Sequence, residues 1–251
     1  MTNKKIFFAS DVHLGHPTVE EGRERELLFA KWLDDIKDQA QEIYLVGDIF
    51  DFWYEYKRVA PRGFTRVLGK IAEITDSGIP VHFFTGNHDV WVYDYLPKET
   101  GVILHREPFE TELLGKKFYI AHGDGLGPGD LNYKLLKFAF TSKFLQFMFS
   151  RLHPNFAFGI AHAWSNKSRG SKGIKAQKFH GEDKELIYLH AKSIAEKQHF
   201  DYYVFGHRHL KINKEITNKS RFILLGDWLY NFSYGVFDGD EFQLKSVKQG
   251  K

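Results

Sequence analysis

Five times along this chain, a short apolar segment runs directly into a group of histidine, aspartate or asparagine residues. These junctions are Asp11-Val12-His13, Gly47-Asp48, Gly86-Asn87-His88-Asp89, His122-Gly123-Asp124 and Gly206-His207-Arg208-His209. Each apolar segment has the length and composition of a buried strand. Because the carboxyl ends of parallel strands meet at one edge of a sheet, we expect the polar residues to assemble into a single site.

The rest of the pattern predicts the sheets that would carry these junctions. Apolar residues recur at helical spacing over 20–39 and 63–75, between expected strands at 5–10, 43–46 and 81–84. This alternation is typical of an α/β fold with parallel pairing. Further strands are expected at 102–104, 109–113, 117–121, 202–205, 211–216, 221–225, 233–237 and 242–247. We therefore predict a two-sheet sandwich flanked by helices.

A helix is also expected over 182–198. Acidic residues would lie in its first turn and Lys192 and Lys197 toward its end, in agreement with the helix dipole. The preceding stretch interrupts the strand pattern, so we divide the chain into a core of residues 1–130 and 179–251 and an inserted helical lid of residues 131–178.

The inserted stretch has an unusual composition. Between Leu131 and Gly181 there is no Asp or Glu, whereas there are nine Lys or Arg residues and eight of the chain's 24 Phe residues. The net charge of the whole chain is only +3, so the remainder is acidic. A basic, aromatic segment indicates an anionic partner. The alternative is a solvated basic surface above packed phenylalanines.

Composition also limits the chemistry and the location. The chain has no cysteine, which excludes disulfides, thiolate metal sites and cysteine nucleophiles. Any metal must then be held by imidazole, carboxylate and amide groups. No apolar run approaches the roughly 18 residues of a membrane-spanning helix, and the N-terminal residues lack the apolar region of a signal peptide. We therefore expect a cytoplasmic protein.

The junctions offer seven metal-binding side chains without sulfur. These are Asp11, His13, Asp48, Asn87, His122, His207 and His209. A single catalytic ion usually takes about three protein ligands, so seven donors are too many for one ion. They suit two ions about 3.5–4 Å apart with a bridging carboxylate, an arrangement that lowers the pKa of a bridging water and binds phosphoryl oxygens.

In their residues and order, the five motifs resemble those of the calcineurin-like metallophosphoesterases, including the Gly-Asp-x-x-Asp form of Gly47 to Asp51. The resemblance implies a four-layer sandwich fold and two divalent metal ions, with manganese expected and iron or zinc as alternatives. It implies one ion held by Asp11, His13, Asp48 and His209. The second would be held by Asp48, Asn87, His122 and His207, with Asp48 as the bridge.

The same resemblance implies catalytic roles for Asp48, Asn87 and His88, with His88 as the acid or phosphate-stabilising group beside the metals. A histidine is suited to proton donation near neutral pH. Asp51 and Asp89 would orient the ligands from behind. For these two aspartates, the alternative is a purely structural role.

The run from Asp124 to Tyr133, followed by basic and hydrophobic helices, resembles the UDP-2,3-diacylglucosamine hydrolases of lipid A biosynthesis. These enzymes cleave a pyrophosphate to give UMP and an acylated sugar phosphate. The resemblance implies peripheral attachment to the cytoplasmic face of the inner membrane and an anionic lipid-linked nucleotide sugar as the substrate. It implies substrate contacts for Asp130, Tyr133, Ser165, Lys167, Arg169 and Lys172. For Lys167, Arg169 and Lys172, exposed surface charge is the alternative.

One residue departs from that group, whose well-known members carry Gly-Asn-Arg-Asp where this chain has His88. The chain is then either a divergent branch of the lipid enzymes or a related phosphoesterase acting on another lipid or on nucleotides, including a soluble phosphodiesterase. A metal-free scaffold, as in the retromer subunit, would require lost ligands, and none is lost. A nuclease fits the basic stretch, but the clustered Phe residues suit acyl chains better than separated base-stacking platforms, so no nucleic acid is expected. The sequence indicates no protein partner.

Overall fold

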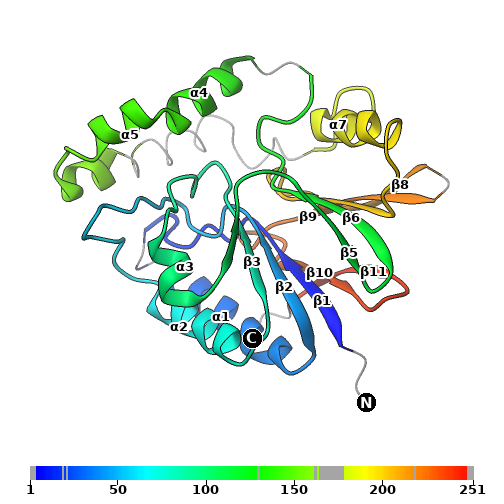
Figure 1. Ribbon diagram of the computed structural model, residues 1–251, viewed down its shortest axis with the longest axis horizontal. Coiled ribbons are helices and arrows are strands. Elements are labelled where there is room, and N and C mark those ends of the chain that lie inside the picture. The colour runs from blue at the N-terminus through cyan, green and yellow to red at the C-terminus, as the bar shows by residue number, and fades with distance from the viewer. Residues whose placement is uncertain are drawn as a thin grey trace.

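A computed structural model describes residues 4–18, 20, 22–128, 131–160, 163, 178–217 and 219–247, with the backbone alone for 131–133. Two sheets face each other, and helices lie on their outer sides (Figure 1).

The first sheet has six strands in the order β11-β10-β1-β2-β3-β4. Its strands are β1 (Lys5–Ala9), β2 (Ala40–Val46), β3 (Val81–Phe84), β4 (Ile103–His105), β10 (Ser233–Phe237) and β11 (Phe242–Ser246). Strands β1 to β4 pair in parallel, as the alternation of strands and helices predicts, whereas β10 joins β1 in antiparallel register. The carboxyl ends of β1, β2 and β3 therefore lie at one edge.

Helices α1 (Arg23–Lys37), α2 (Thr65–Asp76) and α3 (Tyr95–Thr100) accompany this sheet (Figure 1). Alternate strand residues such as Phe7 and Ile43 pack with Phe29 and Trp32 of α1 in one apolar cluster. Leu27 is one of the apolar residues that recur at helical spacing in this stretch, yet it is 45% exposed, and the buried side of α1 includes Phe29.

The second sheet has the order β5-β6-β7-β9-β8, made of β5 (Phe109–Leu113), β6 (Lys116–Ala121), β7 (Tyr202–Phe205), β9 (Ser220–Leu225) and β8 (Lys211–Thr217). The three central strands pair in parallel. Helix α7 (Leu186–Ala195) covers its outer side. The prediction of acidic residues in the first turn of this helix is wrong, because Glu182 and Asp183 precede the helical residues.

Aromatic side chains fill the space between the sheets. The ring centroid of Phe8 on β1 lies 5.2 Å from that of Tyr44 and 5.9 Å from that of Phe118 on β6. All three rings are almost completely buried in one cluster. The layers therefore run helix, sheet, sheet, helix, and the predicted four-layer sandwich is confirmed.

Between β6 and α7, the chain forms α4 (Leu131–Thr141), α5 (Lys143–Phe149) and a further helical stretch at residues 154–160. Hydrogen bonds from Tyr54 and Trp91, in the loops after β2 and β3, hold these helices against the rest of the protein. The indole Nε1 of Trp91 donates a hydrogen bond to the carbonyl of Phe140 at 2.7 Å, and the hydroxyl of Tyr54 donates to the carbonyl of Gln146 at 3.1 Å. Within the described part of the chain, no helix combines the length and the apolar character needed to span a bilayer.

Candidate metal centre

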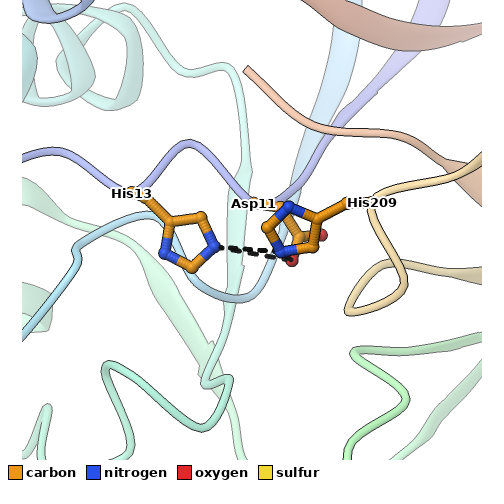
Figure 2. A group of neighbouring side chains, drawn as sticks. All are labelled: Asp11, His13 and His209. Carbon is orange, nitrogen blue, oxygen red and sulfur yellow. Dashed lines mark hydrogen bonds and ion pairs between the residues drawn. The ribbon is translucent and has the colours of Figure 1, made fainter. Parts of the chain in front are cut away.

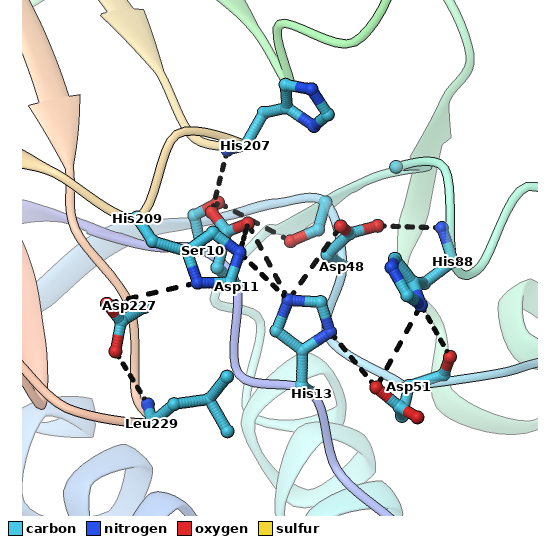
Figure 3. Close-up of polar contacts among 12 residues, drawn as sticks. Ser10, Asp11, His13, Asp48, Asp51, His88, His207, His209, Asp227 and Leu229 are labelled. Atoms are coloured by element: carbon cyan, nitrogen blue, oxygen red, sulfur yellow. Dashed lines mark hydrogen bonds and ion pairs between the residues drawn. The ribbon is translucent and has the colours of Figure 1, made fainter. Parts of the chain in front are cut away.

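Loops at the carboxyl ends of five strands carry the motif residues, and Figure 3 shows those of β1, β2, β3 and β7 close together. Asp11 and His13 follow β1, Asp48 follows β2, and the Gly86–Asp89 motif follows β3. His122 follows β6, and His207 and His209 follow β7. The two sheets thus contribute to one group of side chains.

Asp11, His13 and His209 form the first cluster (Figure 2). Nε2 of His209 lies 3.2 Å from Oδ1 of Asp11 and 3.3 Å from Nε2 of His13. One ligand atom from each residue lies within 4.8 Å of the others, which is the spacing of donors around a common ion.

Asp48, His122 and His207 form the second cluster. Oδ2 of Asp48 lies 3.3 Å from Nε2 of His122 and 3.9 Å from Nε2 of His13, which belongs to the first cluster. The same carboxylate oxygen therefore faces both clusters, as a bridging ligand must. Nδ1 of His122 lies 2.9 Å from the carbonyl oxygen of Val46, and because a carbonyl only accepts, this contact places the proton on Nδ1 and leaves Nε2 for the site.

Several side-chain N and O atoms in the described part of the chain are buried without a hydrogen bond of normal geometry, and among them are three atoms of predicted metal ligands: Oδ1 of Asn87, Oδ1 of Asp11 and Nε2 of His122. A buried polar atom without a partner is costly, and such atoms call for an explanation. All three belong to loops that follow the carboxyl ends of strands β1, β3 and β6, and oxygen and imidazole donors of this kind suit divalent cations. The residues present therefore fit the predicted metal pair.

The backbone is strained at most of these positions. Asp11, His13, Asp48, His207 and His209 have φ angles of 54°, 49°, 53°, 65° and 52°. Residues other than glycine rarely adopt this left-handed region, and where they do the site is often functional. The strain is a signal of function that is independent of the side-chain chemistry.

Two motif glycines are required by the close packing of one motif against another. A Cβ atom on Gly86 would lie 2.2 Å from Oδ1 of Asp48, and one on Gly206 would lie 2.6 Å from Oδ2 of Asp11. Any side chain at either position would displace a neighbouring motif's carboxylate.

The acidic and basic side chains of the site are held in different protonation states. Burial opposes ionisation of Asp11, but the charge of His209 outweighs it and lowers the pKa of the carboxyl to about 2. Burial likewise opposes the charged form of His122, yet the nearby carboxylate of Asp48 raises the pKa of this imidazole well above its ordinary value. Burial, reinforced by the charge of His122, lowers the pKa of His207 to about 4, so His207 is neutral at neutral pH.

His88 lies beside the first cluster, with its ring centroid 4.8 Å from that of His13. Its Nδ1 is 2.8 Å from the main-chain carbonyl oxygen of Asp51, to which it must donate. This hydrogen bond holds the ring so that Nε2 is left for a substrate. His13, Asp51 and His88 also satisfy the spacing of a metal group, but with Nδ1 of His88 engaged we interpret Asp51 as a support for His13, whose Nδ1 lies 3.4 Å from Oδ1 of Asp51.

Asp89 is fully buried. Its carboxylate accepts hydrogen bonds from the amides of Gly86 at 2.7 Å and Ile49 at 2.8 Å, so it joins the loops after β3 and β2. Burial, together with the charge of Asp48, raises the pKa of Asp89 to about 7.

Asp227 is a further functional candidate, which the five motifs did not predict. Oδ2 of Asp227 lies 3.9 Å from Nδ1 of His209, and Oδ1 accepts the amides of Leu229 at 2.7 Å and Tyr230 at 2.6 Å (Figure 3). The amide of Trp228, the residue directly after Asp227, donates a hydrogen bond to the carbonyl of Asp11 at 3.1 Å. The signal was available, because Gly226-Asp227 follows the apolar end of β9 in the same way as the other motifs follow their strands.

The predicted substrate-contacting residues are placed less completely. Asp130, Ser165, Lys167, Arg169 and Lys172 lie outside the described residues, and Tyr133 is described only as part of the α4 backbone. Their roles stay predictions.

The family model for calcineurin-like phosphoesterases matches residues 4–211. The chain belongs to this family. A UDP-2,3-diacylglucosamine hydrolase of Porphyromonas gingivalis is 39% identical over 97% of this chain and 98% of its own length. One from Histophilus somni is 30% identical over 90% of this chain and 92% of its own length. The solved structure of Yfce, a phosphoesterase from E. coli, aligns with a TM-score of 0.45 at 17% identity over 96% of this chain and 92% of that one, a likeness too distant to bear on function.

Membership of the calcineurin-like phosphoesterases confirms the resemblance read from the five motifs, and with it the enzyme class, a metal-dependent hydrolase of phosphoric esters or anhydrides. The His and Asp clusters described above are the candidate metal-binding groups of this member of the family.

Proposed function

We propose that this protein hydrolyses the pyrophosphate bond of UDP-2,3-diacylglucosamine, giving UMP and 2,3-diacylglucosamine 1-phosphate. The observation that carries the proposal is the 39% identity, over nearly the full length of both chains, with the Porphyromonas gingivalis enzyme of that name. The convergence of two His and Asp clusters on one carboxylate oxygen supports the chemistry that this reaction needs.

Two divalent ions, with Mn²⁺ as the proposed metal, would supply Lewis acidity and a water nucleophile at neutral pH when bound. Asp11, His13 and His209 would hold one ion, and Asn87, His122 and His207 the other. Asp48 would contribute to both, because its Oδ2 faces the two clusters.

The chain's own residues set the geometry around the phosphorus. His88 is fixed by its bond to the carbonyl of Asp51, and its Nε2 would donate a hydrogen bond to a phosphate oxygen when the imidazole is protonated. Asp89 holds the Gly86 amide and thereby the loop that presents Asn87 and His88. The ligands are thus fixed before the substrate arrives.

We further propose that α4, α5 and residues 154–160 form a lid that receives the acyl chains and rests on the cytoplasmic membrane surface. These helices expose large apolar side chains, of which Phe138 is 73% and Phe144 69% exposed. The others are Leu135, Leu145, Phe147, Met148, Phe156 and Ile160. Soluble proteins rarely expose so many large apolar groups within one short stretch of the chain. The segment carries basic and no acidic residues, which suits anionic head groups.

The direct test of the reaction is an assay with UDP-2,3-diacylglucosamine dispersed in detergent and with Mn²⁺ present. We expect equimolar UMP and acylated glucosamine phosphate, with turnover removed by EDTA and restored by Mn²⁺. Release of UDP, or cleavage of UDP-glucose at an equal kcat/KM, would contradict the proposal.

The lid is tested separately by flotation with phosphatidylglycerol vesicles. We expect the wild type to float at low salt, and the Lys143→Glu, Arg151→Glu double variant to lose most of this binding. Lys219→Glu, an exposed lysine between β8 and β9, is the control and should float like the wild type. Equal flotation of all three proteins would remove the case for the basic residues of the lid, and a wild type that does not float would contradict membrane contact.

A second candidate is a soluble phosphodiesterase acting on nucleotides, which is favoured by His88 at a position where the resembled lipid hydrolases carry Arg. It predicts cleavage of nucleotide diesters without detergent and no action on the acylated substrate. The same assay therefore separates the two candidates.

A further inference from the structure

Arg208 stands between His207 and His209, yet its side chain is held by a residue far away in the sequence. Its Nε lies 2.7 Å from Oε1 of Glu185, and a terminal guanidinium nitrogen lies 3.2 Å from Oε2. Glu185 is only 3% exposed. A two-point contact of this kind fixes the orientation of both groups as well as their distance.

Glu185 precedes the first residue of α7 and occupies its N-cap position. Acidic and hydroxyl side chains at this position commonly accept a hydrogen bond from a free amide of the first turn. Glu185 makes no such capping bond, because its carboxylate is directed to Arg208. The N-terminus of α7 therefore lacks a side-chain cap, and the carboxylate of Glu185 instead holds the loop after β7 through Arg208.

We propose that Glu185 is a positioning residue for the metal centre, acting through Arg208 on the loop that carries His207 and His209. This loop needs an external hold, because both histidines have φ angles in the left-handed region, at 65° and 52°. Such a conformation persists only where the surroundings enforce it. The proposal depends on the proposed function only for the statement that His207 and His209 hold ions.

The beginning of α7 also contacts the loop of His122. A Cβ atom on Gly123 would lie 2.8 Å from Cδ1 of Ile187 and 3.5 Å from Cβ of His207. The start of α7 thus contacts both loops that supply histidines to the second cluster, the loop of His122 through Ile187 and the loop of His207 through the Glu185–Arg208 pair.

The test measures Mn²⁺ binding by metal-stripped, full-length protein in the absence of substrate, by calorimetry and by elemental analysis after gel filtration. We expect Glu185→Gln and Arg208→Gln to weaken Mn²⁺ binding by about 10- to 100-fold, as the loss of a residue supporting metal ligands does. The double variant should be no weaker than the worse single variant, because both changes remove one shared interaction. Arg208→Lys should be intermediate, because it keeps the charge but loses the two-point contact.

Glu182→Gln is the matched control. Glu182 lies three residues before Glu185 and pairs with Lys214 at the surface, so its removal should leave Mn²⁺ binding unchanged. A merely structural role for Glu185 would lower the Tm of the metal-free protein without a selective loss of Mn²⁺. For a positioning role, excess Mn²⁺ should restore kcat in Glu185→Gln while KM for the substrate stays that of the wild type.

Wild-type Mn²⁺ affinity in Glu185→Gln would overturn the proposal, as would losses in the two single variants that add in the double variant. Its failure is distinguishable from failure of the proposed function. If Glu185→Gln binds Mn²⁺ weakly but the wild type does not cleave the acylated substrate, the positioning role stands and the substrate assignment fails. If the wild type takes up no Mn²⁺, both are overturned.

Discussion

The main-chain amide of His88 donates a 2.8 Å hydrogen bond to Oδ1 of Asp48. This bond occupies one carboxylate oxygen and turns the other toward His13 and His122. The loop after β3 therefore sets the orientation of the carboxylate that follows β2, and the bridging geometry arises from an interaction between two motifs.

Replacing Asp48 with Asn tests this bridge. The amide keeps the shape of the side chain but loses the charge that both clusters share, so we expect loss of bound Mn²⁺. We also expect kcat to fall by more than about 100-fold, which is the largest loss usual for a residue that only supports the metal ligands. Elemental analysis and UMP release are the measurements. Asp38→Asn, at an exposed position after α1, is the control. Two retained ions in Asp48→Asn would argue against a bridge.

Metal uptake should release protons at neutral pH. The carboxylate of Asp48 overcomes the effect of burial and raises the pKa of His122, so this imidazole is protonated in the metal-free protein and must lose its proton before Nε2 binds a cation. Apparent Mn²⁺ affinity should therefore rise with pH up to that raised pKa. His207, with a pKa of about 4, contributes no proton near neutrality.

Calorimetry in buffers of different ionisation enthalpy counts these protons. Removing the half-exposed His199, which lies outside both clusters, should leave the count unchanged. A binding heat that is independent of the buffer would show that His122 is already neutral.

His88→Ala should lower kcat by about 10²- to 10⁴-fold, the usual range for a group that donates a proton or hydrogen bond in the transition state. Bound Mn²⁺ should stay at the wild-type level, because Nδ1 of His88 is committed to the carbonyl of Asp51. His88→Arg should keep more activity than His88→Ala, since a guanidinium can also donate to a phosphate oxygen. Loss of metal in His88→Ala would instead make His88 a ligand.

The aromatic side chains packed between the two sheets should contribute strongly to the stability of the fold. Phe118 is completely buried there, so Phe118→Ala should lower the free energy of unfolding by about 3–5 kcal/mol through lost burial and the cavity left behind. Phe138→Ala, at the 73% exposed residue of α4, should change it by less than about 0.5 kcal/mol. Urea titrations of both variants compare the two, and equal effects would place Phe138 in a packed core.

Local patterns were sufficient to predict the elements that carry the candidate site, because each is an apolar strand followed by a polar turn. They did not predict α3, whose six residues are too few to show a helical period and include Pro97. They placed the acids of Glu182 and Asp183 inside α7, although the chain begins that helix only at Leu186. Long-range features were also beyond local patterns, such as β10 beside β1 and Asp227 behind His209, since both depend on how distant segments pack.

The close packing at Gly86 and Gly206 limits which loops of this protein can be exchanged with those of a homologue. Each lies where a carboxylate from another motif fills the room that a side chain would need. A loop taken from a homologue is shaped to pack against a different neighbouring loop. In hybrid enzymes whose junctions lie within residues 11–209, two loops that pack against each other should therefore be exchanged together. The unit that can be moved between proteins is the interlocked set, whereas a single short motif on its own is not portable.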